Sequence, residues 1–150
     1  WIGSECINRY RISAVDALGN VLGAEATRRI VARDRNKLIT DAKKKRVVNA
    51  LVQLAGQEED FDISDFLDYF HDRGAFTPNQ LSVLMWRLDK HRIPHQKSDF
   101  KLILTRNREK NQLRQMPDWK VEKLLPCMTA AQREICQRVR TTRNDNDTTW

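Results

Sequence analysis

One segment, residues 77–93, constrains the fold more than any other part of the chain. It opens with a helix-capping sequence: Thr77 suits the N-cap, Pro78 suits the first helical position, and Gln80 completes a capping box. Apolar side chains then recur at helical spacing, at Leu81, Val83, Leu84, Met85, Trp86 and Leu88. Pro94 ends the helix. Because a helix that is apolar over more than half of its circumference must be packed on several sides, we expect this segment to be the central helix of one core.

The remaining segments predict a mainly α fold, a compact helical domain of five to seven helices. The segment 24–55 lacks proline and glycine and predicts one long helix, or two nearly collinear helices with a break near Thr40, ended by Gly56. Shorter helices are predicted within residues 62–74 and over residues 107–116, 119–125 and 129–141. Residues 11–23 fit a small hairpin or an irregular connector, and residues 99–105 fit either a strand or the start of a helix. We therefore expect a small irregular or β-containing N-terminus before the helical domain.

Charge is distributed unevenly along the chain, and this unevenness indicates the kind of partner. The net charge is +7 and the isoelectric point is about 9.6. Seven of the 20 acidic residues lie within residues 58–72, which contain no lysine or arginine. The rest of the chain therefore carries 27 basic against 13 acidic residues, a net charge of +14. Nucleic acid is the commonest partner that neutralises so basic a protein, so we expect DNA or RNA as the partner.

Two basic stretches are the candidate sites for nucleic-acid phosphates. The first lies on the predicted long helix and comprises Arg28, Arg29, Arg33, Lys37, Lys43, Lys44, Lys45 and Arg46. The second follows the predicted central helix and comprises Lys90, Arg92, Lys97, Arg106, Arg108 and Lys110. Cations repeated at every helical turn can follow a phosphate backbone, and each contact releases a condensed counterion. Two alternatives remain open for the first stretch: its face is simply solvated, or its bases meet the acidic segment 58–72 within the fold or across a dimer.

The acidic segment 58–72 supports a second hypothesis, in which the chain is a protein-interaction subunit of a larger ribonucleoprotein, defence or anti-defence assembly. The candidate residues for docking a protein partner, or for mimicking phosphate, are Glu58, Glu59, Asp62, Asp65 and Asp68. A third hypothesis is a metal-dependent nuclease. Nuclease carboxylates converge from separate elements, whereas these acids lie consecutively at the start of one helix, where they favour the positive end of its dipole.

The tryptophans, cysteines and histidines are expected to be structural. Trp86 and Trp119 occur among leucines at helical spacing, so we expect them in the core, with stacking on nucleic-acid bases as the alternative. Cys127 and Cys136 are expected to be buried thiols. His91 is four residues from the next histidine, but Pro94 interrupts the turn between them, so we expect no metal there.

Residues 2–10, Ile-Gly-Ser-Glu-Cys-Ile-Asn-Arg-Tyr, and residues 77–80, Thr-Pro-Asn-Gln, carry a resemblance. They resemble uncharacterised bacterial and phage proteins in which a zinc ribbon ending in Gly-Ser-x-Cys precedes a helical domain with a Thr/Ser-Pro-x-Gln helix. The resemblance implies that Cys6 is a zinc ligand. Four ligands require a Cys-x-x-Cys knuckle, which this chain lacks, so the other ligands would lie upstream of Trp1. We thus expect no cofactor in this chain, and zinc only in a longer protein.

Together these observations predict the organisation and class of the protein. Residues 1–23 are expected to be the end of a zinc-ribbon-like module plus a connector, residues 24–141 the helical domain, and residues 142–150 a flexible tail. No apolar run approaches the ~20 residues that span a bilayer, and three widely spaced cysteines favour a cytoplasmic protein without a membrane contact. No nucleophile–base pair, glycine-rich phosphate loop or hydrolase motif is present. The leading hypothesis is a non-catalytic nucleic-acid-binding protein of a phage, plasmid or bacterium.

Overall fold

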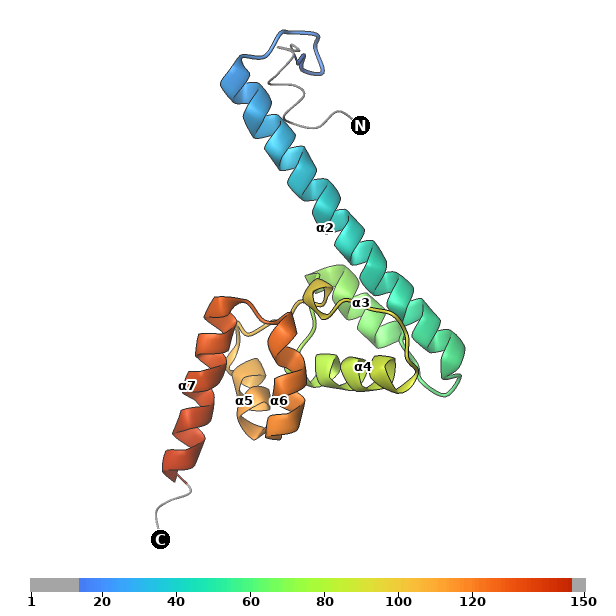
Figure 1. Ribbon diagram of the computed structural model, residues 1–150, viewed down its shortest axis with the longest axis vertical. Helices are drawn as coiled ribbons and strands as arrows, with labels where there is room; N and C mark the ends of the chain where they lie inside the picture. Colours follow the sequence, from blue (N-terminus) through green and yellow to red (C-terminus); the bar gives the residue numbers. More distant parts are fainter. Residues whose placement is uncertain (1–13, 147–150) are drawn as a thin grey trace. The chain divides into compact units, whose positions relative to one another are not determined.

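The mainly α fold is confirmed. The computed structural model describes residues 14–146, with side chains as far as Thr142, and divides the chain into two units, residues 1–43 and 44–150 (Figure 1). The described residues form six α-helices and two short 3-10 helices, and they contain no strand. Of the N-terminus, which we expected to be irregular or to contain β structure, residues 14–23 are irregular apart from one isolated bridge, and residues 1–13 lie outside the described residues.

The first unit consists, in its described part, of a tight turn followed by most of a long helix. A single antiparallel bridge joins Val15 and Val21 across the turn. The Asp16 carboxylate stabilises the turn by accepting the backbone N–H groups of Leu18 and Asn20, at 2.8 and 2.9 Å. Helix α2 (Ala24–Gln57) then begins in this unit and continues without a break into the second. Of the two alternatives for this segment, one continuous helix is therefore observed, and it ends one residue beyond Gly56.

The second unit holds the end of α2 and all the other helices. These are α3 (Ser64–Arg73), α4 (Pro78–Lys90), η1 (Lys97–Asp99), α5 (Asn107–Gln115), α6 (Asp118–Leu124), η2 (Leu125–Cys127) and α7 (Ala130–Asn146). Helix α4 packs against α5 and α6, and α5 packs along α7 (Figure 1). Helix α7 extends past Thr141, where we expected it to end.

Helix α4 is the central helix, as its sequence predicts. The Thr77 hydroxyl accepts the Gln80 backbone N–H at 3.3 Å, and the Gln80 side chain accepts the Thr77 backbone N–H at 3.1 Å, so the capping box is complete. Four apolar side chains of the helix, Leu81, Leu84, Met85 and Leu88, are 0% exposed. The helix therefore owes its position to one fully buried stripe and to a well-capped first turn.

Three aromatic or branched side chains expected in this core are instead largely exposed. Val83 is 38% exposed, Trp86 45% and Trp119 53%. At 100° per residue, Val83 and Trp86 each lie about 150° from the centre of the buried α4 stripe. On α6, Trp119 lies about 170° from the direction shared by the buried Val121 and Leu124. The prediction of core tryptophans was wrong because it weighed residue type above angular position.

The segment between α4 and α5 is neither of the two regular structures considered for it. After η1 the chain becomes extended and forms a single parallel bridge between Leu102 and Phe76. The Phe76 backbone N–H donates to the Lys101 carbonyl, and the Ile103 N–H donates to the Phe76 carbonyl, both at 2.9 Å. This bridge brings Phe76 into the core, where its ring stacks on that of Phe100 at a centroid distance of 6.2 Å.

The two described cysteines are core thiols, as expected. Cys127 and Cys136 are both buried and form no disulfide. Burial raises the pKa of the Cys127 thiol to about 11 and also raises the pKa of the Cys136 thiol. Both side chains therefore behave as small apolar groups that fill the core beside α7.

Candidate nucleic-acid interface

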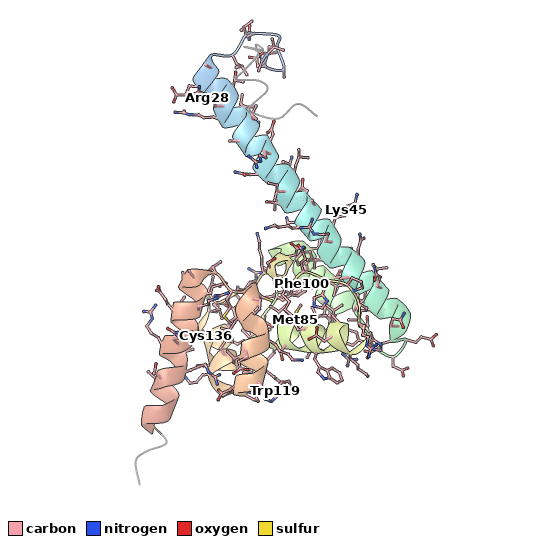
Figure 2. The ribbon with its side chains drawn as sticks, in the orientation of Figure 1. Arg28, Lys45, Met85, Phe100, Trp119 and Cys136 are labelled. Carbon is pink, nitrogen blue, oxygen red and sulfur yellow. The ribbon has the colours of Figure 1, made fainter. Side chains whose placement is uncertain are left out.

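The first predicted basic stretch lies mostly in the first unit, on the exposed part of α2. We call the arginines and lysines of α2 in this unit, including Arg35 in addition to the predicted residues, the α2 basic segment: Arg28, Arg29, Arg33, Arg35, Lys37 and Lys43. All but Lys43, which is partly buried, are exposed. The labelled Arg28 side chain points away from the helix (Figure 2). Arg29, Arg33 and Lys37 recur every four residues, so their Cα atoms rise about 6 Å per step along one side of the helix.

This part of α2 buries little of its surface: Ala24, Val31, Leu38 and Ala42 follow one side of the helix, but only Val31 of these is partly buried. Between residues 24 and 43 the one buried side chain among the described residues is Thr27, and the apolar Leu38 and Ile39 are exposed. Such a helix needs many side-chain pairs along its surface or a partner. Within residues 24–43 the ion pairs are Arg29–Glu25 at 2.6 Å and the neighbouring Arg33–Asp34 pair at 3.1 Å. Both pairs are highly exposed, and pairs of this kind contribute little to stability.

The continuation of the basic stretch, in the second unit, divides into two kinds of residue. The Arg46 guanidinium binds the buried Asp99 carboxylate through two hydrogen bonds, of 2.7 and 3.0 Å. Arg46 therefore has a structural task, because its loss leaves a buried carboxylate unpaired. Lys44 and Lys45 are exposed and have no ion pair among the described residues, and the labelled Lys45 side chain extends outward in Figure 2.

The second predicted basic set is dispersed over several elements of the second unit. Lys90 is at the end of α4, Arg92 is exposed just beyond it, and Lys97 opens η1. Arg106, Arg108 and Lys110 surround the N-terminus of α5. Glu109, buried at the third position of that helix, accepts the Arg106 backbone N–H at 2.8 Å. This carboxylate offsets the unfavourable placement of cations at the positive end of the helix dipole.

Glu58 is the centre of a charge cluster and is not a free acidic side chain. Its carboxylate accepts hydrogen bonds from His91 at 2.6 Å, from Lys90 at 3.4 Å and from Arg87. The side chain is 11% exposed. The hydrogen bond from His91, together with those from Arg87 and Lys90, lowers the pKa of Glu58 to about 2. The Arg87 guanidinium also stacks on Phe61, 4.0 Å from the ring centroid.

Pairing of the α2 bases with the acidic segment 58–72 within the fold was one of our alternatives, and it does not occur among the described residues. Glu58 pairs with bases of α4, and Arg46 pairs with Asp99; among the described residues, the remaining α2 bases have no ion pair to the acidic segment. Most of the acidic segment therefore faces solvent. Glu59 is exposed, as are Asp65, Asp68 and Asp72, which follow one another at i, i+3 and i+7 on the face of α3 opposite its apolar side.

Asp62 has a local structural role. Its carboxylate accepts the Ser64 backbone N–H at 2.8 Å just before α3, and hydrogen bonds from Ser64 lower its pKa. Within the described part of the chain, no three His, Cys, Asp or Glu side chains are grouped so that they could hold a metal ion. Cys6, the zinc ligand implied by the resemblance, lies outside the described residues.

Sequence reasoning placed Trp86 and Trp119 in the core, gave base stacking only as the alternative, and did not connect the exposed residues of α4 with those of α6. We call the surface that these two helices form the tryptophan surface: Trp86, Lys90, Trp119, Lys120 and Lys123. Lys90 Nζ lies 5.1 Å from the Trp86 ring centroid, and Lys120 and Lys123 Nζ lie 5.4 and 6.0 Å from that of Trp119. Figure 2 shows Trp119 at the outside of the second unit, with Met85 and Phe100 in its interior. Angular position on each helix was the signal that would have revealed this surface.

Comparisons with protein-family models, with curated proteins and with solved structures found no match. No helix within the described residues is long and apolar enough to cross a membrane. Function is therefore inferred from the geometry and charge of the site.

Proposed function

We propose that this protein binds nucleic acid without catalysis, through the phosphates, and that the α2 basic segment makes the main contacts. The observation that carries the proposal is a long helix whose first twenty residues bury little of their surface and display exposed cations on several sides. Between residues 24 and 46 the chain has nine basic and three acidic residues. A phosphate backbone supplies the negative charge that this helix lacks.

The unpaired and weakly paired cations are the ones available to phosphate. Arg28 and Arg35 are exposed and have no ion pair among the described residues, and they lie seven residues apart on one side of α2. The exposed pairs of Arg29 and Arg33 are weak enough to be exchanged for phosphate contacts. Arg46 and Lys90 already pair with the largely buried carboxylates of Asp99 and Glu58, so we assign them to the fold rather than to the contact.

The test is a binding titration of the full chain with labelled DNA and RNA, followed by fluorescence anisotropy. A double variant, Arg28→Gln with Arg35→Gln, removes two exposed cations from α2. For each phosphate contact, the logarithm of the association constant K falls by about 0.9 for every tenfold rise in salt concentration. At about 50 mM salt, each contact therefore increases the affinity roughly tenfold. We expect the double variant to bind roughly 100-fold more weakly.

The matched control removes the same charge from the second unit. Arg73→Gln with Arg138→Gln also replaces two exposed arginines, neither of which belongs to the predicted sites. We expect this control to bind within a fewfold of the wild type. Equal losses in the two double variants would show that only net charge matters and would contradict an α2 interface.

A second candidate function is a protein-interaction subunit, which the acidic stripe of α3 favours. Asp65, Asp68 and Asp72 project from one exposed side of a helix whose opposite side is packed. Replacing all three with Asn is expected to release a basic protein partner that co-purifies with the chain, and to leave nucleic-acid affinity at or above the wild-type value. A partner that stays bound to the triple variant would exclude this stripe as its docking site.

A further inference from the structure

We infer that the tryptophan surface of α4 and α6 stacks unpaired bases, so that the protein prefers single-stranded to double-stranded nucleic acid. The inference rests on the proposed nucleic-acid binding and adds a second contact, of a different chemical kind, in the second unit. Phosphate contacts of the α2 basic segment do not distinguish paired from unpaired bases, whereas stacking requires a free base face.

The first step is that both tryptophan side chains are exposed to solvent and lie outside the core. Trp86 and Trp119 lie almost opposite the buried sides of their helices, and about half of each side chain faces solvent. Neither indole belongs to the buried core cluster or to the partly buried side chains packed against it. Two exposed indoles on helices that pack together offer aromatic faces on which a ligand can stack.

The second step is that the two tryptophans are held on one rigid support. Helices α4 and α6 are packed together, and an ion pair of 3.5 Å joins the Asp89 carboxylate on α4 to Lys123 Nζ on α6. Trp86 is one turn before Asp89 on α4, and Trp119 is one turn before Lys123 on α6. Each tryptophan Cα is therefore within about 6 Å, along its helix axis, of a residue that joins the helices.

The third step concerns the lysines, which favour nucleic acid over a protein as the occupant. Lys90, Lys120 and Lys123 lie within 6.0 Å of the two rings. Lysine is depleted in protein–protein interface cores, whereas aromatic rings beside cations are the usual composition of a single-strand site. Lys90 and Lys123 are also paired with Glu58 and Asp89, so the surface contributes stacking more than net charge.

The experiment compares labelled oligo(dT) of about 20 nucleotides with a duplex of the same length, using the full chain. The variant is Trp86→Leu with Trp119→Leu, and Trp86→Phe with Trp119→Phe is the conservative counterpart. Val52→Ala, which removes an exposed apolar side chain from α2 in the same unit and away from α4 and α6, is the control. Circular dichroism melting shows whether each variant is folded, and the Phe variant keeps the test decisive if the Leu variant is not.

We expect the Leu variant to lose roughly 5- to 150-fold in oligo(dT) affinity for each base that no longer stacks, and less than about threefold in duplex affinity. Its salt dependence should match the wild type, because stacking releases no counterions. The Phe variant should retain most of the single-strand affinity. Oligo(dT) affinity that the Leu variant leaves unchanged, or equal losses of affinity for oligo(dT) and for the duplex, would overturn the inference and leave the proposed function standing. Absence of binding to any nucleic acid would overturn both.

Discussion

Replacing Leu84 with Ala should strongly destabilise the second unit, because Leu84 lies at the centre of the buried stripe of α4. Its side chain is 0% exposed, and helices α5 and α6 pack against the helix that carries it. Truncation removes buried methyl and methylene groups and leaves a cavity that the neighbouring helices fill only in part. Fully buried Leu→Ala changes cost about 3–5 kcal/mol of unfolding free energy. In a unit of this size, that corresponds to a fall in Tm of roughly 10–20 °C.

Val83→Ala is the matched control, one residue away on the same helix. Val83 is 38% exposed, and alanine has the higher helix propensity, so we expect a change within about 1 kcal/mol. Urea unfolding followed by circular dichroism measures both variants, and equal m-values make the two midpoints comparable. A Leu84→Ala protein that unfolds within about 1 kcal/mol of the Val83→Ala protein would refute the assignment of α4 as the central helix.

Three further predictions follow from local geometry. Thr77→Ala removes half of the α4 capping box and should cost about 1 kcal/mol, measured by thermal melting. Glu58 has a folded-state pKa of about 2 against an ordinary value of 4.5, so its contribution to stability is complete above pH 4.5 and is lost as the pH falls towards 2. The difference in unfolding free energy between wild type and Glu58→Gln, measured from pH 2 to 7, should therefore grow with pH and level off above pH 4.5. A difference that is largest at pH 2 would contradict the ion cluster. In a Cys6→Ser chain, the buried thiols of Cys127 and Cys136, whose pKa values are raised, should react with a thiol reagent at pH 8 far more slowly in the native state than in urea.

The parts of the fold that follow from local chemistry were predictable. The capping box of Thr77 and Gln80 placed the start of α4, and the structure has the same reciprocal hydrogen bonds between Thr129 and Gln132 at the start of α7, where the helix was expected to begin. The spacing of Leu81, Leu84, Met85 and Leu88 identified the buried side of α4. Each of these signals lies within a few residues of the structure that it specifies.

The pairing of charges was not predictable from the sequence. Arg46 and its partner Asp99 are 53 residues apart, and Glu58 meets Arg87 from 29 residues away. No local pattern distinguishes these bases from Lys44 or Lys45, because the distinction depends on which helices pack together. A basic stretch therefore indicates an anionic partner in general. Which of its cations can bind that partner depends on which of them already pair with carboxylates within the fold.

The tryptophans show a different kind of error. Trp86 and Trp119 were assigned to the core because they are large and lie among leucines. Helical angles place both on the opposite side from the buried residues, and the structure has them exposed. Residue type indicated the wrong environment, and residue position would have corrected it.

The most direct test of the proposed function is the slope of log K against log salt for the wild type binding to nucleic acid. If the six cations of the α2 basic segment meet phosphates, the slope should be about −4 to −5. The Arg28→Gln, Arg35→Gln variant should then be less steep by about 2, because each of the two arginines accounts for about one unit of the slope. A wild-type slope between 0 and about −1, or a slope that the double variant leaves unchanged, would contradict phosphate binding by this helix.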